Sequence, residues 1–317
     1  MPTLAEPARS HDPAVALFQS ERLGCAPAQL LPPLPIAPAP VGVTSTNLPA
    51  NPTQRPAPMN SHQRPAIYLG DHVALTRTAF DHKIYVDTRD ISLAPHILLD
   101  GYWEMWITKI FMRLVQPGMT VIDIGANIGY YSLIAGSHVG PGGKVISFEA
   151  NPSVFRLLAN SMEINGFLGR AELVNQGVMD KQGELTFYSL ASHHGSSSFF
   201  IDPATVSQFR DTMEEIKVTC LSLDEYFADR DPRVDVIKID AEGAEPAIIA
   251  GAQGLLTKNH DVKILMEYTP VNRSAVDALL SLGFKMWNME YDTTLAPVAV
   301  EELDKRPDLS MLYFSRE

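Results

Sequence analysis

The sequence predicts an α/β fold built on a doubly wound, mostly parallel sheet. From Pro117 onward, short runs rich in Val, Ile and Phe alternate with segments of helical periodicity, which is the pattern of β-α-β units. One of these runs, at 119–124, passes through a glycine turn directly into a helix. Helix signals punctuate the alternation: Asn151 followed by Pro152 is a typical helix start, and Gly166 a typical end.

The first 66 residues differ in composition from the rest. They contain 14 of the 24 prolines of the chain, including LPPLPIAPAP at 31–40. Proline has a fixed φ and no backbone N–H, so this density disfavours helix and sheet and favours extended chain. We expect residues 1–66 to be a disordered extension, with a docking segment for a proline-binding partner as the alternative.

Residues 67–116 are expected to form strands and helices that cap the following domain. Val73–Thr78 and Lys83–Thr88 have the composition of two strands around a turn. Apolar residues then recur every three to four positions over 91–115, which predicts one or two helices over the sheet or the mouth of a site. The aromatic residues in this stretch are interpreted as core, with stacking on a ligand as the alternative: Tyr102, Trp103 and Trp106.

Residues 117–317 carry the alternation itself, and we treat them as one domain. The predicted strands lie at 119–124, 144–148, 172–177, 183–188, 218–221, 235–240, 262–268, 284–288 and 311–315. The predicted helices lie at 129–138, 152–165, 223–227, 246–257 and 271–282.

The stretch Val121–Tyr131, VIDIGANIGYY, is the centre of the predicted site. Asp123 interrupts an apolar strand, and a carboxylate buried there is costly unless it has a partner or a function. Gly125, Asn127 and Gly129 then form a tight turn before a helix. Backbone N–H groups at such a turn suit an anionic group.

The spacing of this turn favours one ligand class. Dinucleotide sites have G-x-G-x-x-G, whereas this chain has D-x-G-x-x-x-G. That pattern resembles motif I of the class I S-adenosylmethionine (SAM) methyltransferases, in which the acid and the turn hold the methionine end of SAM. A structural turn in another α/β enzyme is the alternative.

The ends of the next two predicted strands supply further candidates, because ligands of open α/β sheets bind beyond the carboxyl ends of the strands. Glu149 follows the strand at 144–148 and is placed to accept hydrogen bonds from both ribose hydroxyls of a nucleotide. Gln176 to Val178 lie, by position, beside the adenine.

The second strong signal is VIKIDAEGAE at 236–245, at the end of the fourth predicted strand of the parallel sheet. Lys238 and Asp240 leave the strand on the same face, and we expect them to pair. Asp240, Glu242 and Glu245 surround the start of the next helix, whose dipole accounts for one acid without catalysis. We expect at least one of these groups to be functional, since clusters of this kind tune pKa values.

Two more features are candidates for the same site. His193 and His194 belong to a polar, glycine-containing loop that contributes either a base, a substrate contact or only surface. A metal site that combines these histidines with the acids is conceivable, but no ligand spacing supports it, and no metal is predicted. Glu267, at the end of the strand 262–268, is expected to line the same pocket.

Taken together, the motifs resemble the FkbM family of SAM-dependent methyltransferases over roughly residues 70–290. They are VIDIGANIGYYS, VISFEANP, Asn165–Gly166 and VIKIDAEGAE. The resemblance implies a seven-stranded, Rossmann-like class I fold whose last strand is antiparallel, with SAM as cofactor. It also implies O-methylation of a hydroxyl or carboxyl on a small molecule, often a sugar. The expected SAM-binding residues are Asp123, Gly125, Asn127, Gly129, Glu149, Gln176 and Val178. The expected catalytic residues are Asp240, Lys238, Glu242 and His194.

Composition and charge limit the partners and the compartment that we expect for this chain. A net charge of −12 argues against a sequence-independent nucleic-acid binder. Cys25 and Cys220 fit no metal spacing, which suggests a reducing compartment, the cytoplasm. No apolar run is long enough to span a membrane, and no secretory signal is expected. A nicotinamide-dependent oxidoreductase and a non-catalytic nucleotide-binding module remain the alternatives, and the acceptor and oligomeric state stay open.

Overall fold

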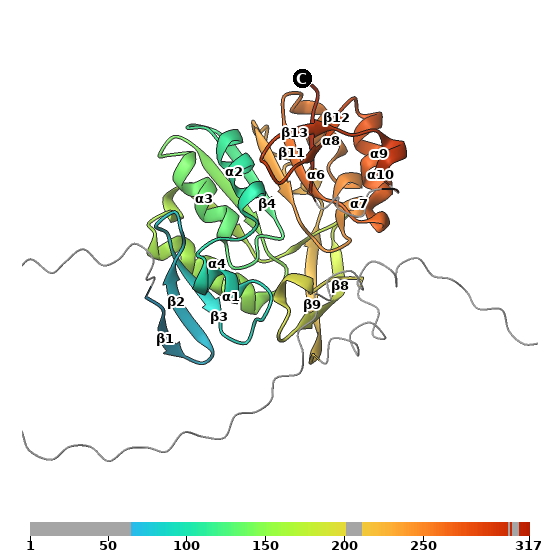
Figure 1. Cartoon of the computed structure of the whole chain (residues 1–317). Helices are drawn as coiled ribbons and strands as arrows, with labels where there is room; N and C mark the ends of the chain where they lie inside the picture. The colour runs from blue at the N-terminus through green and yellow to red at the C-terminus, as the bar shows by residue number, and fades with distance from the viewer. Residues whose placement is uncertain (1–64, 201–210, 304, 306–310) are drawn as a thin grey trace, which may run out of the picture. The chain divides into compact units, whose positions relative to one another are not determined.

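The computed structural model describes residues 65–200, 211–303, 305 and 311–317, and Figure 1 shows how their helices and strands are arranged. The extension predicted at 1–66 lies outside the described residues except for its last two positions.

An eight-stranded, mostly parallel sheet forms the framework. Its strand order is β13-β12-β14-β11-β10-β4-β5-β6. β6, β5, β4, β10 and β11 run parallel, whereas β14 lies antiparallel between β11 and β12. The predicted fold class and antiparallel last strand are therefore confirmed. The strands are β4 (Thr120–Ile124), β5 (Lys144–Phe148), β6 (Ala171–Val174), β10 (Val236–Ile239), β11 (Lys263–Glu267), β12 (Lys285–Met289), β13 (Leu295–Pro297) and β14 (Met311–Ser315).

The eighth strand, β13, was not expected from the sequence. A tight turn after β12 folds the chain back on itself: Thr293 N–H donates to Glu290 O (2.8 Å) and Glu290 N–H to Thr294 O (3.0 Å). Thr293 adopts a φ of +71° there. β13 then pairs antiparallel with β12 at the edge of the sheet.

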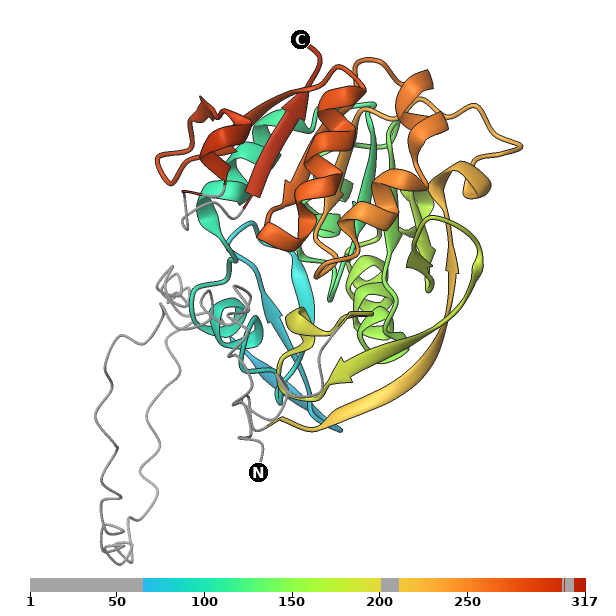
Figure 2. The same cartoon turned by 90° about the vertical axis from the view of Figure 1, so that its right-hand side faces the viewer.

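Helices cover both faces of the sheet, which makes it doubly wound. Residues of one face, such as Val121 and Val236, pack with α2, α3 and α4, whereas Ile122 and Ile237 face α7, α8 and α9. In Figure 2 the orange helices of the second layer lie in front of the sheet. The helices are α2 (Met105–Leu114), α3 (Tyr130–His138), α4 (Pro152–Ile164), α6 (Leu223–Tyr226), α7 (Glu245–Ala250), α8 (Gln253–Lys258), α9 (Arg273–Ser281) and α10 (Val300–Leu303).

The prediction of a single helix at 246–257 was wrong, because the structure has two helices there, α7 and α8, with Gly251 between them. The Gly251 carbonyl accepts the N–H of Asp224 (2.9 Å). A Cβ at Gly251 would lie only 2.2 Å from the carbonyl oxygen of Met179. The close approach of the segment after β7 therefore requires a glycine and interrupts the helix.

A second sheet of three strands has the order β7-β9-β8, with β8 and β9 forming a long antiparallel pair. The strand predicted at 172–177 is thus divided between β6 in the large sheet and β7 in this one. The strand predicted at 218–221 is the end of a longer one, β9. Their bounds are β7 (Gly177–Val178), β8 (Gly183–Leu190) and β9 (Met213–Leu221).

The N-terminal segment forms a third sheet, β1-β2-β3, and helix α1. The two predicted strands and two helices are present, and β1 is an addition. The sheet is joined to α4 and its C-cap residue Asn165 by three hydrogen bonds. Tyr85 N–H donates to Ser161 Oγ and Lys83 N–H to Asn165 Oδ1 (both 3.0 Å), and the Asn165 side-chain amide donates to the Lys83 carbonyl (2.6 Å). Their bounds are β1 (Ile67–Gly70), β2 (Val73–Arg77), β3 (Lys83–Asp87) and α1 (Ala94–Leu99).

Candidate active site

A cavity of about 310 Å³ opens at the carboxyl ends of β4, β5 and β10. This is the edge at which open α/β sheets bind ligands. Loops far apart in the sequence complete its wall. The lining includes Trp103, Glu104, Gly125, Ala126, Asn127, Tyr131, Phe148, Glu149, Gln176, Val178, His194, Phe199, Lys238, Asp240, Glu242 and Glu267.

The glycine turn after β4 brings bare backbone to the cavity. Gly125, Asn127 and Gly129 have φ values of +74°, +51° and +94°, so the turn depends on residues that tolerate the left-handed region. A Cβ at Gly125 would lie 1.8 Å from the carbonyl oxygen of Asp240. Glycine is therefore required where β4 and β10 end side by side.

Glu149 lines the cavity at the end of β5. Its Oε2 accepts the N–H of Asn127 (2.8 Å) and its Oε1 accepts the N–H of Asn151 (2.8 Å). Burial raises the pKa of Glu149 to about 7, although these backbone hydrogen bonds act in the opposite direction. The carboxylate is thus fixed by the glycine turn on one side and by the start of α4 on the other.

Asp123 lies beside the cavity rather than in its lining. It is fully buried, its Oδ2 accepts the Ser132 hydroxyl (2.6 Å), and its register partner on β10 is Lys238. Burial raises its pKa, against the effect of the nearby Lys238 charge. Among the residues predicted to bind SAM, Gly125, Asn127, Glu149, Gln176 and Val178 line the cavity, whereas Asp123 and Gly129 do not.

Lys238 is the buried cation of the site. It is 2% exposed, and its Nζ lies 2.9 Å from Asp240 Oδ2 and 4.6 Å from the centre of the Tyr131 ring. Burial alone would lower its pKa, but the charges of Asp240 and Asp123 outweigh it, and the pKa is raised. Lys238 therefore stays protonated, and its positive charge offsets the negative charges of Asp123 and Asp240.

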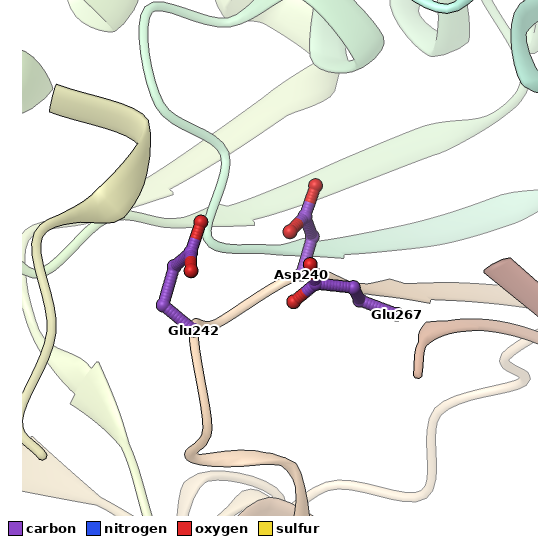
Figure 3. Close-up of side chains that lie close together, drawn as sticks. All are labelled: Asp240, Glu242 and Glu267. Carbon is purple, nitrogen blue, oxygen red and sulfur yellow. The ribbon is translucent and has the colours of Figure 1, made fainter. Parts of the chain in front are cut away.

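Three acids converge at the ends of β10 and β11. Asp240, Glu242 and Glu267 each offer one carboxylate oxygen, and these oxygens all lie within 4.8 Å of one another. Figure 3 shows the three side chains around a common space. Burial, with the charge of Asp240, raises the pKa of Glu242 to about 8 and that of Glu267 well above its usual range. Three acids in this arrangement could hold a metal ion, and no metal site was predicted from the sequence.

Glu245, the third acid of VIKIDAEGAE, has a local task. It is fully buried, and its two oxygens accept the N–H groups of Ala241 (2.8 Å) and Gly243 (2.9 Å). It fixes the turn before α7 and does not line the cavity.

The structure adds Glu104, which the sequence analysis missed. It precedes α2 with a φ of +38° and lines the cavity beside Trp103. Burial, and to a smaller extent the negative charge of Asp240, raise the pKa of Glu104 to about 7. A single acid within an otherwise apolar helical stretch was the signal available. Trp103, interpreted as core, reaches the cavity wall, whereas Trp106 stacks on Tyr291 (4.6 Å between ring centres).

The two histidines diverge. His194 lines the cavity and is 9% exposed, with Nε2 placed 3.2 Å from Asp87 Oδ2. His193 instead pairs with Asp211 (2.8 Å). Arg89 bonds Asp87 through Nε and Nη2. Burial would raise the pKa of Asp87, but its hydrogen bonds to Arg89, together with the nearby His194, hold it below the usual value.

The residues present fit SAM. A ribose needs a fixed carboxylate at the end of β5, which Glu149 provides. The adenine needs an apolar wall, which Phe148 and Val178 offer. The methionine end needs close approach to backbone, which the turn at Gly125 permits.

Comparison with known proteins agrees with this fit. The family profile described as "Methyltransferase FkbM domain" matches residues 123–291. The chain is 29% identical over 181 residues to the 31-O-demethyl-FK506 methyltransferase FkbM of Streptomyces tacrolimicus, covering 48% of this chain and 67% of that protein. It is 30% identical over 141 residues to a putative ribosomal RNA methyltransferase of Schizosaccharomyces pombe, covering 43% of this chain.

The chain spans 45% of the length of that Schizosaccharomyces pombe protein and 59% of methyltransferase sdnD of Sordaria araneosa. Among solved structures, a SAM-dependent O-methyltransferase of Thermotoga maritima aligns with a TM-score of 0.41 and 14% identity, over 82% of this chain and 87% of that one. Fibrillarin of Aeropyrum pernix with bound SAM aligns with a TM-score of 0.38 and 12% identity, over 80% and 99%. Because the profile covers more than half of the sequence, including the glycine turn and the acids of β10, the chain belongs to the FkbM methyltransferase domain family of SAM-dependent methyltransferases.

Proposed function

We propose that the protein transfers a methyl group from SAM to a hydroxyl oxygen of a small molecule, such as a sugar or a secondary metabolite. One observation carries the proposal. Glu149, the carboxylate at the end of β5 that suits a ribose, lines the same cavity as the acids Asp240, Glu242 and Glu267. SAM, when bound, supplies a methyl group on a sulfonium. The chain's own residues hold the reactants and manage the proton.

Glu149 and the backbone at Gly125 and Asn127 would hold the cofactor end of the cavity. Their positions are set by hydrogen bonds and glycine geometry rather than by mobile side chains. Lys238 would hold Asp240 in place through their 2.9 Å ion pair. Such fixed groups favour catalysis by proximity and orientation, which a methyl transfer needs above all.

A hydroxyl acceptor must also lose its proton, and His194 is the group that we propose for this task. It lines the cavity, and Asp87 lies against one ring nitrogen, which would leave the other to accept a proton. Asp240 and Glu242 would orient the acceptor. These roles extend the prediction that Asp240, Lys238, Glu242 and His194 are catalytic.

The charges of the lining support a neutral acceptor over an anionic one. Its acids are Glu104, Glu149, Asp240, Glu242 and Glu267, against Lys238 as the one lysine or arginine among the lining residues that the structure describes. A carboxylate or an RNA phosphate would find no lysine or arginine among these lining residues except Lys238, which already pairs with Asp240. We therefore propose a small hydroxylated acceptor rather than a carboxyl group or nucleic acid, although one relative is named a putative ribosomal RNA methyltransferase.

In the described part of the chain, no helix is long and apolar enough to cross a membrane. Cys220 is a buried free thiol, which fits our proposal of a reducing, cytoplasmic setting.

Calorimetric titration with SAM and, separately, with NAD tests the cofactor. We expect micromolar binding of SAM and at least tenfold weaker binding by Glu149→Gln, since one charge and one acceptor are lost from a buried site. Glu163→Gln, an exposed acid on α4, is the control and should bind normally. Binding of NAD in place of SAM would overturn the proposal in favour of an oxidoreductase.

The acceptor is then sought with methyl-labelled SAM. Panels of neutral sugars and hydroxylated metabolites are compared with carboxylic acids and with ribosomal RNA. Label in a hydroxylated small molecule supports the proposal, whereas label only in RNA or only in acids contradicts it.

A further inference from the structure

We infer that Asp240, Glu242 and Glu267 bind a divalent cation with a preference for oxygen ligands, Mg²⁺ or Mn²⁺. The inference deepens the proposed function, since its catalytic value rests on that function. The binding itself is a separate property that can be measured without an acceptor.

The geometry of the three carboxylates suits such an ion. One oxygen of each lies within 4.8 Å of the others, and in Figure 3 the side chains approach one space from the ends of two strands. Oxygens on opposite sides of a Mg²⁺ ion are about 4.2 Å apart at bond lengths of about 2.1 Å. Three oxygens within 4.8 Å of one another lie at most about 2.8 Å from a common centre, so movements of the carboxylate oxygens by up to about 0.7 Å bring all three to bonding distance.

The second observation is Glu267 itself. Its Oε2 is shielded from solvent and has no hydrogen-bond partner among the described residues, and the side chain points toward Asp240 and Glu242 (Figure 3). A buried carboxylate oxygen without a donor is costly, and native structures provide a partner for nearly all such atoms. A bound cation would be that partner.

The charge balance points the same way. Lys238 lies against Asp240 Oδ2 (2.9 Å) and thus leaves Asp240 Oδ1 for another ligand. Glu242 and Glu267 form no ion pair in the described part of the chain, and Glu104 and Glu149 bring the acids that line the same cavity to five. Only oxygen donors converge here, which selects Mg²⁺ or Mn²⁺ over the softer transition metals.

A cation at this place would lie in the same cavity as His194, the base that we propose for the acceptor hydroxyl. It would contact the hydroxyl oxygen and lower its pKa. The O–H proton would pass to His194, while the methyl group leaves sulfur for oxygen and S-adenosylhomocysteine remains as the neutral product. Every bond formed is matched by one broken, and no redox partner is needed.

To test the site, the full chain is first freed of metal with a chelator and then titrated with Mn²⁺ alone. Electron paramagnetic resonance measures how much of the Mn²⁺ remains free. We expect about one equivalent of bound Mn²⁺, displaced by Mg²⁺. Glu267→Gln should weaken binding at least tenfold. Glu242→Gln, on the turn between β10 and α7, is the second variant in case the first fails to fold. Glu184→Gln, an exposed acid on β8, is the control.

The two proposals fail separately. Absence of a one-equivalent site in the wild type, or equal binding by both variants and the control, overturns the metal site. SAM calorimetry on the same preparations then shows whether the cofactor proposal stands. Binding of Mn²⁺ without binding of SAM would support the metal site and overturn the proposed function.

Discussion

His194 Nε2 lies 3.2 Å from Asp87 Oδ2, which joins the loop after β8 to the last residue of β3. Both side chains are buried. Asp87 is held in turn by the side chain of Arg89 and by the Arg89 N–H (2.9 Å). The N-terminal sheet therefore fixes the orientation of a histidine that belongs to the wall of the cavity.

Replacing Asp87 by Asn tests this relationship. An amide keeps the shape but offers no charge to hold the ring, so we expect turnover with an identified acceptor to fall about ten- to a hundredfold. The affinity for SAM should stay within about twofold, because Asp87 does not line the cavity. Steady-state kinetics and calorimetry give the two quantities.

The control for this variant is Asp81→Asn, which breaks an exposed pair with Arg77 (2.8 Å) and should leave both quantities unchanged. Equal turnover by Asp87→Asn and Asp81→Asn would show that the contact with His194 has no catalytic value.

Gly125→Ala should destabilise the fold strongly. The new Cβ would lie 1.8 Å from a backbone oxygen at Asp240 and would also strain a φ of +74°. We expect a loss of more than about 3 kcal/mol in the free energy of unfolding, measured with denaturant. Gly118→Ala is the matched control, because its φ is +82° but nothing lies within 4 Å; strain alone should cost about 1–2 kcal/mol. Similar losses in both variants would contradict the close approach of β4 and β10.

Lys238→Met should also destabilise the fold. It removes the cation that faces Asp240 and lies in register with Asp123. An uncompensated buried carboxylate then remains, and we expect a loss of about 3–5 kcal/mol. Lys144→Met is the control. It removes a half-exposed ion pair with Glu172, and we expect it to lower the free energy of unfolding by less than about 1 kcal/mol. Unfolding in denaturant measures both losses. Equal losses in the two variants would contradict this role of Lys238.

The affinity for SAM should rise with pH through neutrality. Burial raises the pKa of Glu149 to about 7, from 4.5, so the native protein holds a proton there that the unfolded chain has lost. The contribution of Glu149 to stability is therefore greatest below pH 4.5 and is lost as the pH rises through 7. Only the ionised form accepts hydrogen bonds through both oxygens.

From pH 6 to pH 8 we accordingly expect SAM to bind about tenfold more tightly, as the ionised fraction of Glu149 increases. Calorimetry over this range measures the change. Glu149→Gln should bind weakly and without that pH dependence. A pH dependence that persists in the variant would assign it to another group.

Local sequence determined the parts of the site that lie at strand ends. A turn such as Val121–Tyr131 needs glycines at fixed spacing, and parallel strands end at one edge of the sheet. Glu149, Lys238 and Asp240 could therefore be placed near the cavity without a structure. Family, fold class and cofactor followed from the same short-range patterns.

Tertiary structure alone decided the contacts between distant segments. Nothing near Asp87 in the sequence points to His194, and Glu104 reaches the cavity from a segment that precedes the first strand of the predicted domain. The same holds for Gly251, where an approaching segment divides a helix that periodicity predicts as continuous. The physical reason is one of range: hydrophobic period and turn chemistry act over a few residues, whereas packing between layers determines which loops meet.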